Sequence, residues 1–156
     1  MRRGLFQAHG MIRLLDVNVL LALAWPSHLH HEQAHRWFRQ HRSEGWATCP
    51  ATQSGFVRLS ATRAVVPEPM TPVEAIAAME RSASQPEHHF WPQDEEVAGI
   101  SPEIMVRIMG PRQMSDAVLL DLAIKHGGRL ATFDHAMLHL IPRGSPLADH
   151  IEIIAT

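Results

Sequence analysis

The chain has 156 residues, of which 46% are hydrophobic, and a net charge of −2. This length supplies one hydrophobic core and is too short for two comfortable domains, and the near-neutral charge argues against a general nucleic-acid coat protein. The single cysteine, Cys49, excludes an internal disulfide framework and favours a reducing compartment, which indicates the cytoplasm.

The first ten residues show no periodic pattern, whereas an apolar pattern begins at Met11. We therefore expect residues 1–10 to be an N-terminal arm or an over-long translational start, with Met11 as the alternative start, and residues 11–156 to form one domain. An arginine pair precedes an apolar stretch, as in a secretory signal, but Arg13, Asp16 and Asn18 interrupt that stretch and argue against one. No window approaches the roughly 18 apolar residues of a membrane span, so no membrane partner is expected.

Charge is unevenly distributed along the chain. Residues 1–63 hold eight arginines against three acids, whereas residues 64–108 hold two arginines against eight acids. A basic first third is compatible with a phosphate backbone as partner, although charges that are separate in sequence need not be separate in space.

The first half of the chain alternates short apolar runs with helical patterns. Predicted strands lie at 12–15 and 45–49, and predicted helices at 17–25, 32–42, 52–62 and 71–84, with a loop at 63–70. Pro26 ends the first helix, and Pro72 lies in the first turn of the last one.

The second half repeats the alternation. It predicts strands at 88–91, 130–133 and 151–154 and helices at 101–109 and from Ser115 to His126. Ser115 is a good N-cap for the latter helix, and one of the two glycines at 127 and 128 supplies its left-handed stop. Strands separated by helices predict an α/β fold, a three-layer α/β/α domain with a mostly parallel central sheet.

Three acids stand where such a fold gathers ligands. Asp16 and Asp134 each follow a predicted strand, and Asp116 lies at the start of a helix. Because ligands bind at the carboxyl ends of parallel strands, we expect these acids to converge as catalytic metal ligands. Oxygen-only ligands favour Mg²⁺ or Mn²⁺, which would activate a water for phosphodiester hydrolysis. Taken singly, each acid also fits an ordinary turn or helix-dipole role.

Polar residues near the acids are candidates for support. Asn18 and Thr132 lie two residues from Asp16 and Asp134, where they would orient a carboxylate or a metal-bound water. Ser115 is a weaker candidate because its helix-cap role is sufficient reason for it.

Three segments together resemble the PIN-domain family, and VapC-type toxins of bacterial toxin-antitoxin systems in particular. They run from Ile12 to Leu23, from Trp46 to Ser60 and from Asp116 to Asp134, so the resemblance covers the chain from about Met11 to its C-terminus. It implies an Mg²⁺- or Mn²⁺-dependent endoribonuclease that cleaves structured RNA such as transfer or ribosomal RNA. It also implies a homodimer inhibited by a cognate antitoxin protein.

The resemblance assigns residues as well. Asp16, Asp116 and Asp134 match the family's metal-site acids, whereas Gln53 stands where a fourth acid, usually glutamate, is expected. Glutamine keeps an oxygen ligand but loses a charge, which predicts weaker metal affinity. Arg58, Arg112 and Arg129 are candidates for RNA phosphate contact, with solvated surface arginines as the alternative.

Three other functions compete. The segment from His31 to His35 reads His-Glu-Gln-Ala-His and matches the zinc-metallopeptidase pattern, although coincidence is easy in a chain with twelve histidines. An aspartate after a strand also suits a haloacid-dehalogenase-like phosphotransferase, but Asn18 stands where the second acid is needed. The third is a PIN-like domain that binds RNA or protein with weak or no catalysis. The sequence feature that favours it is Gln53, which stands in place of an acid.

Overall fold

The computed structural model describes residues 11–156, so the expected arm at residues 1–10 lies outside the described residues. Five strands form one sheet in the order β3-β2-β1-β4-β5. They are β1 (Arg13–Leu15), β2 (Trp46–Thr48), β3 (His88–Phe90), β4 (Arg129–Thr132) and β5 (Ile151–Ile153). Every pairing is parallel, so the expected mostly parallel sheet is confirmed and is parallel throughout.

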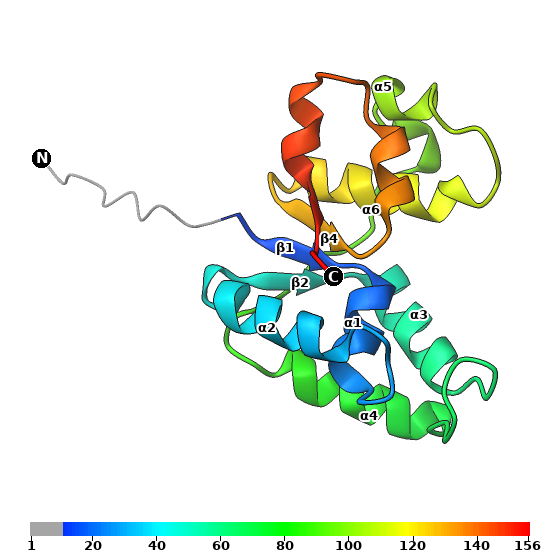
Figure 1. Cartoon of the computed structure of the whole chain (residues 1–156). Helices are drawn as coiled ribbons and strands as arrows, with labels where there is room; N and C mark the ends of the chain where they lie inside the picture. Colours follow the sequence, from blue (N-terminus) through cyan, green and yellow to red (C-terminus); the bar gives the residue numbers. More distant parts are fainter. Residues whose placement is uncertain (1–10) are drawn as a thin grey trace, which may run out of the picture.

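Helices cover both faces of the sheet (Figure 1). One layer holds α1 (Val17–Ala24), α2 (His31–His41), α3 (Pro50–Ser60) and α4 (Pro72–Ala83). The other holds α5 (Pro102–Met105), α6 (Gln113–Lys125) and the 3-10 helices His135–Leu140 and Pro146–His150, and shorter 3-10 turns occupy Arg42–Glu44 and Val97–Gly99. The three-layer α/β/α prediction is therefore confirmed. None of the described helices is long and apolar enough to cross a membrane.

Strand alternation divides the core into two parts. Leu14 and Leu130 pack into the cluster beneath α5 and α6, whereas their neighbours Leu15 and Ala131 pack into the cluster beneath α1 to α4. Successive side chains of a strand point to opposite faces, so a strand buried on both sides is apolar throughout. All four residues are fully buried, and this explains why the short central strands read as continuous apolar runs.

The strand order reverses direction beside β1. The chain moves outward from β1 to β2 and β3, then returns across the sheet to β4 and β5. In an open α/β sheet, the crevice at the carboxyl ends of the two strands flanking such a reversal is the usual ligand site. Here those strands are β1 and β4, which are followed by Asp16 and Asp134.

Two local predictions are wrong. Ser115 does not cap α6, because the turn bonds from Gln113 N to Gly110 O and from Met114 N to Pro111 O let the helix begin at Gln113, and Ser115 lies exposed inside it. The helix expected at 101–109 is only four residues long, because the chain after Met105 continues in tighter turns, with Arg107 N bonded to Ile104 O and Ile108 N bonded to Met105 O. The predicted left-handed stop is confirmed at Gly127, whose φ is 65°.

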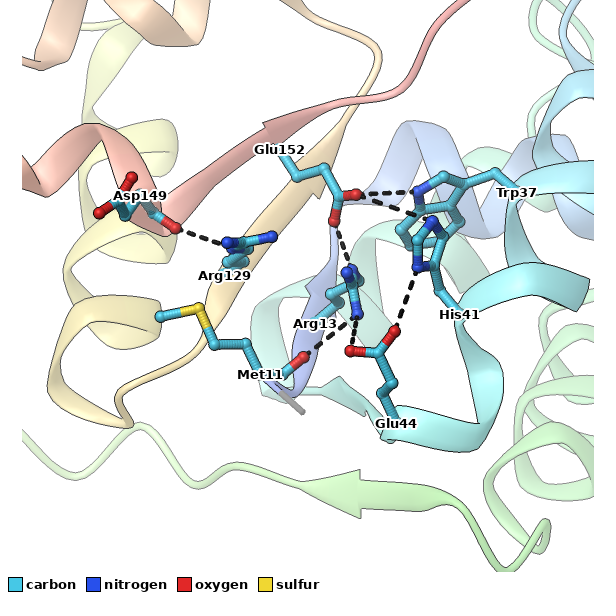
Figure 2. Close-up of polar contacts among 8 residues, drawn as sticks. All are labelled: Met11, Arg13, Trp37, His41, Glu44, Arg129, Asp149 and Glu152. Carbon is cyan, nitrogen blue, oxygen red and sulfur yellow. Dashed lines mark hydrogen bonds and ion pairs between the residues drawn. The ribbon is translucent and has the colours of Figure 1, made fainter. Parts of the chain in front are cut away.

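A buried arginine joins four elements at the amino end of the sheet (Figure 2). Arg13 of β1 is only 4% exposed and pairs with Glu152 of β5 and, at 3.2 Å, with Glu44. Trp37 Nε1 of α2 donates to Glu152 at 3.3 Å, and the hydrogen bond from Arg13 lowers the pKa of Glu44. The cluster fixes the edge strand β5 and helix α2 to the centre of the sheet.

We predict that Arg13→Ala lowers the free energy of unfolding by about 3 kcal/mol, because it leaves Glu152 partly buried without its cation. Urea denaturation followed by circular dichroism measures this. Arg129→Ala is the matched control: Arg129 lies at the same end of the sheet and its side chain donates to the Asp149 carbonyl, so its removal should cost under about 1 kcal/mol. Equal losses for the two variants would contradict a special role for Arg13.

Candidate active site

Asp16 is the buried acid of the site, with 9% of its surface exposed. It follows β1 directly and is the N-cap of α1, where its Oδ1 accepts a hydrogen bond from Val17 N at 2.7 Å. Its Oδ2 accepts from the Thr132 hydroxyl at 2.8 Å. Both carboxylate oxygens are therefore held in place, and the side chain has one defined orientation.

Thr132 connects the ends of β1 and β4. Its fully buried hydroxyl donates to Asp16 and accepts from Asn18 Nδ2 at 3.1 Å and from the Asp134 backbone N–H at 3.0 Å. A hydroxyl has one donor and two acceptor positions, so this one is fully used. Asn18 Oδ1 accepts from Phe133 N at 3.3 Å. Asn18 and Thr132, both expected to orient the site, thus contact one another.

The three predicted acids differ in exposure. Asp134 is exposed and caps the 3-10 helix His135–Leu140, with its Oδ1 accepting from Ala136 N at 2.9 Å. Asp116 is half-buried in the first turn of α6. The site therefore contains a buried acid directly after β1, a half-buried acid on α6 and an exposed acid after β4.

The acids lie close enough to repel one another. Burial and then the negative charges of Asp16 and Asp134 raise the pKa of Asp116 to about 6. Burial also raises the pKa of Asp16, with a contribution from Asp134, against the lowering effect of its bonds to Thr132 and Val17. An excess of negative charge in a partly dry site is what a cation would neutralise.

The donor chemistry of the site fits Mg²⁺ or Mn²⁺, although the acids do not meet at one point. Within residues 11–156, no three His, Cys, Asp or Glu side chains lie close enough to hold one ion in common. Mg²⁺ is usually bound through one or two carboxylates and keeps several waters, so it does not need such a cage. Asp16, Asp134 and Asp116 are the residues that would hold it.

Gln53 forms its side-chain hydrogen bond with Thr48 of β2, and not with one of the three acids. Its Nε2 donates to the Thr48 hydroxyl at 2.9 Å, and the same hydroxyl lies 2.7 Å from His88 Nε2. Sequence reasoning missed Thr48 as the partner of Gln53; the position of Thr48 at the end of β2 was the available signal. Ser115 is exposed on the first turn of α6, and no bond joins it to an acid among the described contacts.

The three candidate arginines lie in separate places. Arg58 is exposed on α3 and lines a groove between α3 and α4, and Arg112 is exposed at the start of α6. Arg129 begins β4, at the opposite end of the sheet from Asp134, and donates to the Asp149 carbonyl at 2.9 Å (Figure 2). Its place at the amino edge does not suit phosphate contact beside the acids, so Arg129 is left out of the proposed site.

The zinc pattern has a structural explanation. His31 Nδ1 lies 2.7 Å from the Ala22 carbonyl, and His35 Nε2 lies 2.8 Å from the Leu23 carbonyl. These carbonyls end α1 and have no partner within their helix, so the two histidines cap it. Among the described residues no third metal-binding side chain joins these two histidines, so the structure gives no support to the zinc-metallopeptidase alternative.

Comparison with known proteins agrees with this geometry. The model of the PIN domain family matches residues 13–141, which include all three acids. This chain belongs to the PIN domain family. Among its relatives in Mycobacterium tuberculosis, Ribonuclease VapC39 is 46% identical over 127 residues, covering 81% of this chain and 91% of the relative.

Two further relatives place the chain in the VapC-type branch of the PIN domain family. Ribonuclease VapC38 is 41% identical over 127 residues, covering 81% of this chain and 88% of the relative. Ribonuclease VapC29 is 36% identical over 130 residues, covering 83% and 91%. Both come from the same organism, and both span nearly the whole of the PIN domain described above.

The electrostatics predict that Asp116→Asn stabilises the metal-free PIN domain at neutral pH. The folded-state pKa is raised, so ionising Asp116 opposes folding: stability is highest below the ordinary value of 3.8 and falls as pH rises towards about 6. Removing the charge should add on the order of 1 kcal/mol above pH 6, discounted for partial exposure, and nothing at about pH 4.

Urea denaturation in EDTA across this pH range measures the effect. Asp149→Asn, an exposed acid in the 3-10 helix Pro146–His150, is the matched control and should give no such pH dependence. An equal gain in stability at both ends of the pH range would show that the ionisation of Asp116 does not oppose folding.

Proposed function

We propose that this chain is a metal-dependent endoribonuclease, the toxin component of a type II toxin-antitoxin module acting in the cytoplasm. The observation that supports this best is the junction of β1 and β4, where one threonine hydroxyl holds Asp16 and the Asp134 backbone together. The acids stand at the strand reversal of a sheet that the PIN domain family uses, and relatives over most of the chain are ribonucleases by name.

The substrate is structured RNA, either transfer or ribosomal RNA. A bound Mg²⁺ or Mn²⁺ supplies a water of lowered pKa and neutralises charge on the phosphate. Asp16, fixed by Thr132 and Val17, is the rigid ligand, and exposed Asp134 is the ligand nearest to solvent. Asp116 contributes a carboxylate that ionises fully when a cation relieves the repulsion from its neighbours.

The supporting residues act through the ligands. Asn18 fixes the Thr132 hydroxyl with its amide nitrogen and the Phe133 N–H with its oxygen, so it sets the path of the chain into Asp134. Such second contacts determine ligand orientation in metal sites. The partners that go with this function are the RNA, a cognate antitoxin protein and a second copy of the chain in a homodimer.

A domain that binds RNA or protein without cutting is the second candidate, and Gln53 is the observation that favours it. This side chain adds no charge to the site and bonds to Thr48. The two candidates differ in one result: only the nuclease gives metal-dependent product.

The test of the nuclease is cleavage of a pool of transfer and ribosomal RNA with Mg²⁺, Mn²⁺, Zn²⁺ or EDTA. Wild type should cut with Mg²⁺ or Mn²⁺ alone, and Asp16→Asn or Asp134→Asn should lose more than about 100-fold in rate. Thr132→Val, which removes only the orienting hydroxyl, should lose roughly 10- to 100-fold, the range for second contacts.

Asp149→Asn makes the same charge change on an exposed acid far from the site and should cut like wild type. RNA cleavage that is unchanged in Asp16→Asn would contradict the acidic-site mechanism. RNA binding with no product under any metal would establish the binding-only alternative.

A further inference from the structure

A cavity of about 690 Å³ lies at the start of α6, outside the acid cluster. Its wall is the segment from Val106 to Gln113, which connects α5 to α6, together with His139 from the 3-10 helix after β4. Both elements belong to the layer of α5 and α6 (Figure 1).

The two walls are continuous with two of the acids. Gln113 precedes Asp116 by three residues on α6, so the two share one face of the helix. His139 lies on the 3-10 helix that Asp134 caps. Since Gln113 lines the cavity and neighbours Asp116 on α6, the cavity lies beside the turn of α6 that carries Asp116.

The charged groups at the cavity are basic. Its lining contains Arg107, Arg112 and His139 and no acid. Arg107 Nε donates to the His139 carbonyl at 2.8 Å, which fixes the guanidinium and leaves its other N–H groups for a ligand. The ion pairs found among residues 11–156 involve neither Arg107 nor Arg112. In a chain of net charge −2, this is a local match for an anion.

Two solvent-exposed apolar side chains also line the cavity. Met109 is 86% exposed and Val106 is 78% exposed, and both line the cavity. A site for phosphate alone needs only the cations, whereas a nucleotide also presents the flat face of a base. Unstacked bases are bound between aromatic or apolar side chains, next to basic residues that hold the backbone.

We propose that this cavity binds a nucleotide of the RNA strand adjacent to the cleaved phosphate. Arg107 and Arg112 hold its backbone phosphates, and its base packs on Met109 and Val106. This inference rests on the proposed function and names a binding subsite for it. The same contacts favour an unpaired nucleotide, because a paired base would not present its face to the cavity.

The test measures binding of a short fluorescein-labelled single-stranded RNA by fluorescence anisotropy, in EDTA, with the full chain carrying Asp16→Asn so that no cutting occurs. Adding Arg107→Ala and Arg112→Ala should weaken binding about 10-fold and reduce the slope of log affinity against log salt by about 1.4, for two lost contacts to a single strand. Met109→Ser should weaken binding with the slope unchanged. A fully paired RNA duplex of the same composition, which has no unpaired base, should bind more weakly than the single strand.

Arg36→Ala with Arg39→Ala is the matched control, since both arginines are exposed on α2 in the other layer, and it should change affinity less than twofold. Arginine variants at the cavity that bind like this control would overturn the inference. If the double variant does not fold, Arg112→Ala alone, at an exposed position, replaces it. We expect it to weaken RNA binding and to reduce the slope of log affinity against log salt by half as much as the double variant.

Two further outcomes separate this inference from others. If Met109→Asp converts a dimer into a monomer in light scattering while RNA affinity stays unchanged, the face belongs to a second copy of the chain and the subsite is refuted. If wild type binds RNA through the cavity but yields no product with Mg²⁺ or Mn²⁺, the proposed nuclease fails and the subsite stands.

Discussion

The hydroxyl of Thr132 is the contact on which the site depends. It is buried where β4 ends, donates to Asp16 at the end of β1, and accepts from Asn18 and from the Asp134 backbone. Strand pairing alone sets β1 and β4 side by side, but it does not orient a side chain that follows a strand. One hydroxyl with every bonding position used gives both acids a fixed relation, and it does so without adding charge to a site that is already too negative.

The charged groups at the two ends of the sheet have opposite effects on stability. At the amino end, Arg13 is buried against two glutamates, and this ion-pair cluster binds the last strand to the first. At the carboxyl end, the three acids take part in none of the ion pairs between residues 11–156, and the pKa of Asp116 rises to about 6. Repulsion of this kind lowers the stability of the metal-free fold and supplies affinity for a divalent ion, so stability is concentrated away from the site.

Much of the fold followed from the pattern of the sequence, and the reasons are local. The apolar runs at β1 and β4 are buried on both faces, which leaves no ambiguity about their burial, and Asp16 and Asp134 mark their ends. What failed depends on contacts distant in sequence or on backbone geometry. The start of α6 is set by the turn at residues 110–112, and the three 3-10 helices that follow residue 96 have no periodic signal. The candidate site was predictable in its residue types, whereas the bond from Gln53 to Thr48 depends on the path of the chain between β2 and α3.

We propose that the acids at the junction of β1 and β4 hold a divalent cation. Binding of Mn²⁺, followed by electron paramagnetic resonance on wild type, Asp16→Asn and Thr132→Val with Asp149→Asn as the control, tests it without any RNA. We predict saturable binding that weakens at least about 10-fold in Asp16→Asn, weakens by a smaller factor in Thr132→Val, and is unchanged in the control. Binding of equal strength in all four proteins would contradict it.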